Sequence, residues 1–230
     1  MVEMMDKSVG IGADPAGCTG ALALLVDRTA AGGAGRGIVF AAAHEAQTVD
    51  VVAMALHARG ICTVTVNEST AMRLGLYAQG QSPRVGDEPY GVNSVEAVAC
   101  DETGISARER ATTMRALANP AAVAEDLVTP GHVMVQVARN ILRAGATLGE
   151  QANALLSASG VARFAAWSDI LNDSGEIGDA AWCAALARRL DIACYDAGTA
   201  RNFARHRLGA WDEVVRFSAS HFGDIAPTQP

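Results

Sequence analysis

The feature that most constrains the fold is a repeated change of hydrophobic period along the chain. Between Gln47 and Arg59, apolar side chains recur with the spacing of one face of an amphipathic helix, and Gly60 ends the segment. The next segment, Ile61 to Val66, is rich in β-branched residues and is typical of a strand. Because short helical and extended segments alternate in this way, we predict an α/β or α+β domain in which helices cover a sheet.

Further segments of both kinds extend the alternation. We predict helices over 69–74, 106–117, 148–157 and 179–190, and strands over 133–137, 164–170 and 191–195. Ser106 and Glu109 have the spacing of a capping box at the start of one helix. The stretch 79–91 is rich in Gly, Ser, Pro, Asp and Asn, so we expect a loop there.

The chain divides into three parts at the level of sequence. We expect a flexible leader over 1–14, one domain over 15–208 and a C-terminal extension over 209–230. The extension has one amphipathic stretch over 211–217 and an end that we expect to be frayed. The leader has no apolar core bounded by basic residues, so it lacks the pattern of a signal peptide.

Composition narrows the classes of partner. Of 230 residues, 50% are hydrophobic and 19% are charged, which excludes intrinsic disorder as the main state. A formal net charge of -7 argues against nucleic acid or an anionic membrane as the primary partner. No apolar run approaches the roughly 20 residues of a membrane span. Five scattered cysteines favour free thiols, so we expect a cytoplasmic protein.

His132 is the first candidate for chemistry. It follows Thr129, Pro130 and Gly131 and directly precedes the apolar residues of a predicted strand. An imidazole exposed at the mouth of a strand suits general acid–base catalysis near neutral pH. A turn histidine that bonds only to the backbone is the structural alternative.

Two loops that lead into helices are candidate anion sites. In the segment from Arg143 to Thr147, an arginine and a hydroxyl stand next to the free N–H groups of a helix that begins near Leu148. Thr103 and Ser106 bound a second loop of this kind. At each loop the alternative is an ordinary helix cap without a functional role.

Asp169 and Cys62 lie in predicted strands. A carboxylate in the apolar segment around Asp169 needs a charge partner or a functional site, because an unpaired buried charge is costly. Capping of the loop that follows Asp169 is the alternative. Cys62 is more often a buried small hydrophobe than a reactive thiol. No cluster of His, Cys, Asp or Glu has metal-ligand spacing, so we predict no metal site and no cofactor.

Six stretches follow one another in an order that is typical of a known family. They are residues 38–42, 54–62, 103–113 (TGISARERATT), 130–133, 143–145 and 170–173. Through them the chain resembles the 3,4-dihydroxy-2-butanone 4-phosphate synthase family of the riboflavin pathway. The resemblance implies a three-layer α+β domain, with a central mixed sheet covered by helices, and a homodimer with active sites at the subunit interface. Family members use magnesium to convert ribulose 5-phosphate to formate and a four-carbon ketone phosphate.

The chain departs from the family where the family binds its metal. The acidic Arg-Glu-Asn-Glu-Gly-Asp loop of the family, which supplies a magnesium ligand, is matched by Gly32–Gly37, and the second ligand is matched by Ala146. Glycine and alanine side chains offer no oxygen to magnesium. Asp169 stands where the family has a catalytic glutamate. The resemblance implies that the retained residues are the acid–base His132, the phosphate-binding Arg143 and Thr147, Cys62 and the Thr103–Ser106 loop.

We therefore predict a lyase-type or isomerase-type enzyme that acts without a metal on a small carbonyl or phosphorylated substrate in a specialised natural-product pathway. His132 and Asp169 would exchange protons with the substrate in an isomerisation, elimination or cyclisation. The residues predicted to contact the substrate are Arg143, Thr147, Thr103, Ser106 and Cys62. One alternative is a true 3,4-dihydroxy-2-butanone 4-phosphate synthase with an altered metal site. The other is a non-catalytic binding or scaffold protein.

Overall fold

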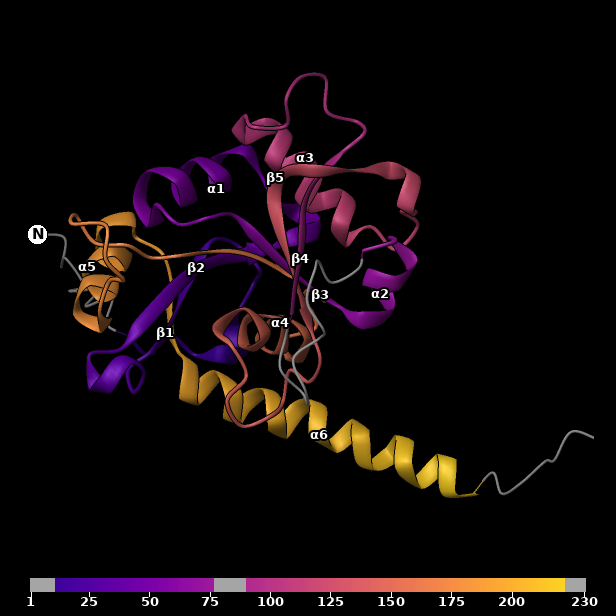
Figure 1. The fold of residues 1–230 in the computed structure, drawn as a ribbon. Coiled ribbons are helices and arrows are strands. Elements are labelled where there is room, and N and C mark those ends of the chain that lie inside the picture. Colours follow the sequence, from indigo (N-terminus) through magenta and orange to yellow (C-terminus); the bar gives the residue numbers. More distant parts are fainter. Residues whose placement is uncertain (1–10, 77–89, 222–230) are drawn as a thin grey trace, which may run out of the picture.

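A mixed sheet forms the middle layer of the molecule, in a computed structural model that describes residues 11–76 and 90–221 (Figure 1). Its strands are β1 (Ala23–Asp27), β2 (Arg36–Ala42), β3 (Thr63–Asn67), β4 (Tyr90–Ala97), β5 (Leu127–Ala138), β6 (Ala165–Asp169) and β7 (Cys194–Asp196). Among the described residues the strand order is β4-β5-β3-β6-β2-β1-β7. Two neighbouring pairs are parallel, β3 with β5 and β1 with β7, and the others are antiparallel.

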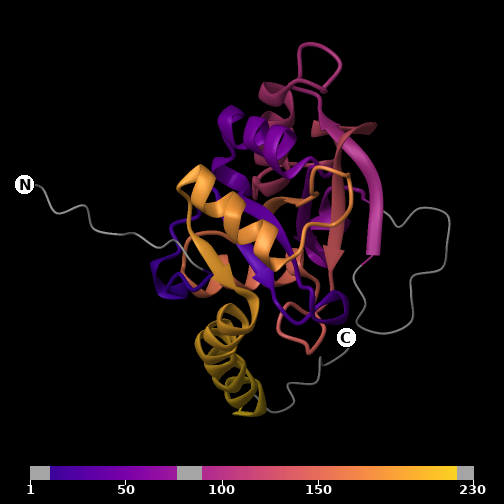
Figure 2. The same ribbon diagram turned by 90° about the vertical axis from the view of Figure 1, so that its left-hand side faces the viewer.

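Helices cover both faces of this sheet, as Figures 1 and 2 show from two sides. They are α1 (Thr48–Ala53), which continues as a π-helix over Met54–Ala58, α2 (Glu68–Arg73), α3 (Ala107–Ala118), α4 (Leu148–Ala158), α5 (Ala180–Leu190) and α6 (Ala197–His221). Side chains of α1, α3 and α5 pack on one face of the sheet, and those of α4 and the first turns of α6 pack on the other. The predicted three-layer α+β fold is thereby confirmed.

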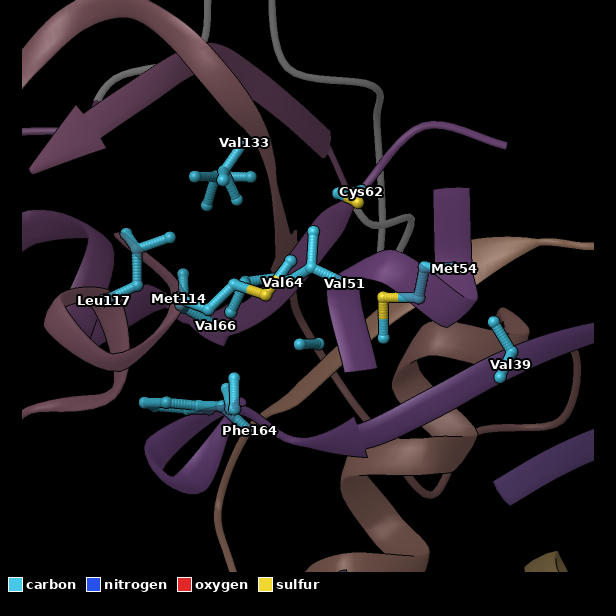
Figure 3. Packing of buried hydrophobic residues seen from close by; sticks show 14 of the residues in the cluster. Val39, Val51, Met54, Cys62, Val64, Val66, Met114, Leu117, Val133 and Phe164 are labelled. Atoms are coloured by element: carbon cyan, nitrogen blue, oxygen red, sulfur yellow. The ribbon is translucent and has the colours of Figure 1, made fainter. Parts of the chain in front are cut away.

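The face under α1 and α3 holds a large hydrophobic core, shown in Figure 3. Val64 and Val66 of β3, Val133 of β5, and Met114 and Leu117 of α3 are each at most 1% exposed. Alternate residues of a strand point to opposite faces of a sheet, so these valines meet the helices while their neighbours point to the other side. Complete burial of one such side chain contributes about 1.5–3 kcal/mol. This face therefore supplies much of the stability of the domain.

Every predicted helix and strand is present, and the ends differ by at most three residues except at the start of β5. The strands β1, β2 and β4 were not among those predicted from periodicity. The expected boundary at residue 209 falls inside α6. Most of the expected leader, the loop over 79–91 apart from its last two residues, and the final nine residues lie outside the described part of the chain.

Candidate active site

The site face of the sheet is the side of β5, β3 and β6 that lies opposite the core under α1 and α3. In β5, Val133 and Val135 point into that core, whereas His132, Met134 and Gln136 are half-buried or exposed. Alternation along the regular part of the strand therefore places Met134 and Gln136 together on the site face. The predicted catalytic histidine is exposed and does not belong to the main core.

The strand register relates the segments that carry His132 and Asp169. Thr63 of β3 pairs with Met134 on one side and with Trp167 on the other. Beyond this row the register changes, since Arg59 rather than Gly60 pairs with Ile170, and His132 belongs to a segment that protrudes from the β4–β5 ladder. His132 and Asp169 thus lie two residues from Met134 and Trp167, at the ends of regular pairing in β5 and β6.

A cavity of about 410 Å³ opens on the site face. Its lining combines apolar side chains with a few polar groups from four strands and the loops that follow them. The lining residues are Gly60, Ile61, Thr63, Gly91, Met134, Val135, Gln136, Trp167, Asp169, Leu171 and Ile177. Asp169 is the carboxylate in this lining, so the cavity holds one of the two predicted catalytic residues.

Asp169 forms an ion pair with Arg36 at the edge of this cavity. Asp169 is the last residue of β6 and Arg36 is the first of β2, and these strands are antiparallel neighbours. The Arg36 Nη2 atom lies 2.6 Å from the Asp169 Oδ1 atom, and the two side chains are 42% and 33% exposed. The charge partner expected for Asp169 is therefore a guanidinium from the segment that matches the acidic loop of the family.

His132 lies in a bulge inside β5 and not at the mouth of a strand as expected. Val95 of β4 faces Val133, but the next residue, Glu96, faces Val128, so residues 129–132 protrude from the ladder. At Gly131 a Cβ atom would lie 2.1 Å from the Val95 carbonyl carbon. Only glycine allows the two strands to approach so closely. The bulge leaves the His132 side chain 40% exposed.

Glu96 is the charge partner of His132, and no local pattern in the sequence indicates this pair. The Glu96 Oε2 atom lies 3.5 Å from the His132 Nδ1 atom. Glu96 also packs on the Thr103–Ser106 loop, since a Cβ atom at Gly104 would come within 2.2 Å of its Oε2 atom. The structure thus brings His132 and this predicted substrate-binding loop together through one carboxylate. The two segments are distant in sequence, so only the strand pairing reveals this contact.

Ser106 caps α3 as the capping-box spacing predicted. The Ser106 hydroxyl accepts a hydrogen bond from the Glu109 amide at 3.2 Å, and the Glu109 carboxylate accepts one from the Glu102 amide at 2.8 Å. The Glu102 amide bond, opposed by desolvation and assisted by the Ser106 hydroxyl, holds the pKa of Glu109 below its ordinary value. A helix cap accounts for the contacts of Ser106, and its role in substrate binding stays a prediction.

A polar network behind the cavity includes Thr147 and Arg143. The Thr147 hydroxyl donates to the Gln136 Oε1 atom at 3.2 Å, and the Thr65 hydroxyl donates to the same atom at 3.0 Å. Thr147 also caps α4 in a capping box with Glu150. Arg143 lies 3.4 Å from the fully buried Glu150 carboxylate. Since Gln136 lines the cavity, Thr147 lies directly behind its wall, and Arg143 joins the network through Glu150.

Cys62 lies apart from these groups. It belongs to the core under α1 and α3, where it is 2% exposed, and Arg110 donates to its sulfur at 3.3 Å. Desolvation raises the pKa of the Cys62 thiol although the Arg110 charge acts in the opposite direction. The structure does not bring Cys62 together with Asp169, and its contact with substrate stays a prediction.

The residues at the metal-binding positions of the family do not fit magnesium. Gly32, Gly33 and Gly35 have no side-chain donor, Ala146 offers a methyl group, and Arg36 carries a positive charge. This guanidinium already contacts the Asp169 carboxylate and would repel a dication there. Within residues 11–76 and 90–221, no three His, Cys, Asp or Glu side chains are grouped as metal ligands. The donor set is thus unlike an oxygen-rich magnesium site.

The family model described as 3,4-dihydroxy-2-butanone 4-phosphate synthase matches residues 18–198. Among curated proteins, the 3,4-dihydroxy-2-butanone 4-phosphate synthase of Pseudomonas aeruginosa is 32% identical over 181 residues, which cover 75% of this chain and 47% of that protein. The riboflavin biosynthesis protein RibBA of Mycobacterium ulcerans is 42% identical over 101 residues, or 42% of this chain and 23% of that protein. The matched part of this chain thus spans less than half the length of these relatives.

Solved structures share the fold. A two-domain 3,4-dihydroxy-2-butanone 4-phosphate synthase from A. baumannii has a TM-score of 0.69 and 23% identity, and the match covers 78% of this chain and 53% of that one. A 3,4-dihydroxy-2-butanone 4-phosphate synthase in complex with two magnesium ions has a TM-score of 0.67 and 22% identity, covering 83% and 93%. No helix among the described residues is long and apolar enough to cross a membrane.

Proposed function

The chain belongs to the 3,4-dihydroxy-2-butanone 4-phosphate synthase family, and from this membership we propose that it is an enzyme that transfers protons without a metal ion. Its substrate would be a small carbonyl compound or a phosphorylated sugar. The observation that supports this proposal best is the Arg36–Asp169 ion pair of 2.6 Å, at a cavity edge where the family pattern has an acidic loop. The reaction class is isomerisation, elimination or cyclisation, because acid and base groups alone can catalyse each of these reactions of a carbonyl compound.

His132 and Asp169 would be the two proton carriers. His132 is 40% exposed, and Glu96 lies 3.5 Å from its Nδ1 atom, so Glu96 can orient the ring and leave Nε2 toward the substrate. Asp169 lines the cavity. One group would take a proton from the carbon next to a carbonyl, and the other would deliver a proton to the opposite end of the substrate.

Arg143 and Thr147 would hold an anionic group of the substrate. Both belong to the loop and first turn of α4, and Thr147 contacts Gln136 in the cavity wall. Arginine and hydroxyl donors beside a helix N-terminus suit a phosphate. Thr103, Ser106 and Cys62 are retained as proposed contacts on the strength of the family pattern alone.

We further propose a homodimer whose interface covers the site face. Ile61 and Ile177 line the open cavity and are 68% and 45% exposed. Exposed apolar side chains around a partly open site are typical of an interface between subunits. A second copy would close the cavity and exclude water from the reaction.

Proton exchange in heavy water tests this function. Purified protein in EDTA is incubated with ribulose 5-phosphate and other pentose and tetrose phosphates, and NMR follows deuterium incorporation. We expect exchange that is insensitive to EDTA, and His132→Asn should slow it by about 10²–10⁴-fold. His206→Asn on the exposed side of α6 is the matched control. Full exchange in His132→Asn would remove this residue from the mechanism.

A true 3,4-dihydroxy-2-butanone 4-phosphate synthase is the second candidate, because His132, Arg143 and Thr147 match the family pattern. It would release formate from ribulose 5-phosphate and stop in EDTA. Formate that appears only with added magnesium would establish this candidate over the metal-independent one. Binding of sugar phosphates without exchange or formate would instead favour the non-catalytic alternative, in which Arg36 neutralises Asp169.

A further inference from the structure

Arg36 is a basic residue within Gly32–Gly37, the segment that matches the acidic loop of the family pattern. We propose that Arg36 binds an anionic oxygen of the substrate, either a carboxylate or the enolate that forms from a carbonyl, beside Asp169. The guanidinium would thereby supply the positive charge that a divalent cation supplies elsewhere in the family. This inference rests on the proposed metal-independent function.

The donors of Arg36 support this role. Its Nη2 atom donates a hydrogen bond to the Asp169 Oδ1 atom at 2.6 Å. The Nε atom is buried and has no hydrogen-bond partner among the described residues. A guanidinium has five N–H donors in a planar fork, and because this Nε is buried, the remaining Nη donors are those that a second planar oxyanion would contact. Arg36 can therefore hold a ligand and Asp169 at the same time.

The surroundings of Arg36 leave space for that ligand. The Arg36 side chain is 42% exposed, so solvent reaches part of its guanidinium. Asp27, which pairs with Arg36 in the β1–β2 ladder, accepts hydrogen bonds from Thr29. The ion pair of Arg36 in the described structure is with Asp169 alone. A partly exposed guanidinium with one charge partner is suited to an anion from outside.

Stability alone does not account for the position of the Arg36–Asp169 ion pair at the edge of the cavity. Pairs with exposed side chains contribute only about 0–1 kcal/mol to stability. Arg36 and Asp169 are both partly exposed, so stability is a weak reason for this pair. Their place at the edge of a 410 Å³ cavity, with Asp169 in its lining, instead points to a ligand. An arginine cannot lose its charge near neutral pH, so the positive charge at this edge is permanent.

The expected ligand class follows from the two arginines that are proposed to hold anionic groups. Arg36 would bind an oxyanion, and Arg143 is the residue proposed to hold a phosphate. A short molecule with a carboxylate at one end and a phosphate at the other offers one group to each arginine, and 2-phosphoglycolate is such a probe. Its carboxylate resembles the charge and planarity of an enediolate.

Calorimetry with 2-phosphoglycolate and EDTA-treated protein tests the inference without turnover. We expect binding in EDTA, a Kd at least 10-fold weaker in Arg36→Gln, and an intermediate Kd in Arg36→Lys. Arg28→Gln, which removes the exposed Arg28–Asp196 pair, is the matched control and should bind as the wild type does. Circular dichroism confirms that each variant is folded.

Asp169→Asn separates ligand binding from a structural role. If Arg36 binds the anion, loss of the competing carboxylate should keep or tighten the Kd, and Arg36→Gln in this background should again weaken it at least 10-fold. If the pair only maintains the local structure, Asp169→Asn and Arg36→Gln should weaken binding equally. Equal weakening, an unchanged Kd in Arg36→Gln, magnesium-dependent binding or no binding at millimolar probe would each overturn the inference.

These outcomes are distinct from failure of the proposed function. His132→Asn should change the Kd of the probe less than Arg36→Gln does, because His132 is proposed to transfer protons and not to hold an anionic group. If His132→Asn abolishes proton exchange while Arg36→Gln leaves the Kd unchanged, only the inference about Arg36 fails. If Arg36→Gln weakens probe binding while His132→Asn keeps full exchange, only the proposed function fails.

Discussion

The two faces of β3 and β5 belong to the same strands but differ in burial and in polarity. The face under α1 and α3 is a dry core of valines that are at most 1% exposed. The site face holds a threonine–glutamine–tryptophan network and an open cavity, and a half-exposed histidine protrudes from β5. Side chains on the first face are determined by packing, whereas those on the second can change if their charges stay balanced. This difference would allow the family fold to persist while residues at the metal-binding positions of the family pattern change.

The departures from the family pattern follow the same division. Arg36 and Asp169 lie at the edge of the cavity, and Ala146 lies in the loop before α4. None of the three belongs to the core under α1 and α3. A change on the site face therefore alters chemistry at little cost to folding, and a change on the core face alters folding first. Each prediction below tests this separation.

Val135→Asp should have the largest effect. Val135 is 1% exposed in the core, and a buried unpaired carboxylate costs several kcal/mol, a large share of the about 5–15 kcal/mol that stabilises a domain. We expect loss of the cooperative thermal transition. Met134→Asp, one residue away on the site face, should fold with a change in stability of about 1 kcal/mol or less. Similar losses in both variants would contradict the separation of the faces.

Thr65→Val should have an intermediate effect, because it removes a hydroxyl from the buried network. Thr65 is fully buried, accepts from the Trp167 indole at 2.9 Å and donates to Gln136 at 3.0 Å. Leaving these partners unsatisfied should lower the free energy of unfolding by about 1–3 kcal/mol, measured by urea denaturation. Thr63→Val is the control, since its hydroxyl makes a single 3.4 Å bond to the Ile61 carbonyl. Equal stability of the two variants would argue against the network.

Glu109 should give a smaller, pH-dependent effect. Its pKa is lower in the folded state than in the unfolded chain, chiefly because the Glu102 amide bonds to the carboxylate. Its stabilisation is therefore complete above the ordinary glutamate pKa and is lost as the pH falls through the lowered folded value. Thermal melts from pH 7 to pH 3 should show a smaller drop for Glu109→Gln than for the wild type. Glu125→Gln, at an exposed position, should behave as the wild type.

Thiol labelling should give the smallest effect on the protein and the clearest contrast between buried and accessible positions. Burial raises the pKa of Cys62, and it raises the pKa of Cys183 to about 12 and that of Cys194 to about 11. Iodoacetamide at pH 8 should therefore label the half-buried Cys100 before these three, as read by mass spectrometry. Early labelling of Cys62 would mean that it is accessible from the site face after all.

Local patterns in the sequence predicted the elements well. The helical period over 47–59 and the Ser106 cap at α3 describe interactions between residues at most four positions apart, and both are present. Periodicity missed β1 because it is a short apolar run without alternation, which does not distinguish a strand from a buried helix segment, and it missed β2 because Gly37 and two alanines weaken the strand signal. The bulge at His132 was missed because it depends on how β4 aligns with β5.

The sequence by itself determined the fold class, the family and the absence of acidic side chains from the Gly32–Gly37 segment. Tertiary structure alone decided which charges meet. Arg36 and Asp169 are 133 positions apart, and His132 and Glu96 are 36 apart, so no local spacing could pair them. The physical reason is that periodicity reports neighbours along one element, whereas the partners in this site are fixed by the order and register of strands that are distant in the chain.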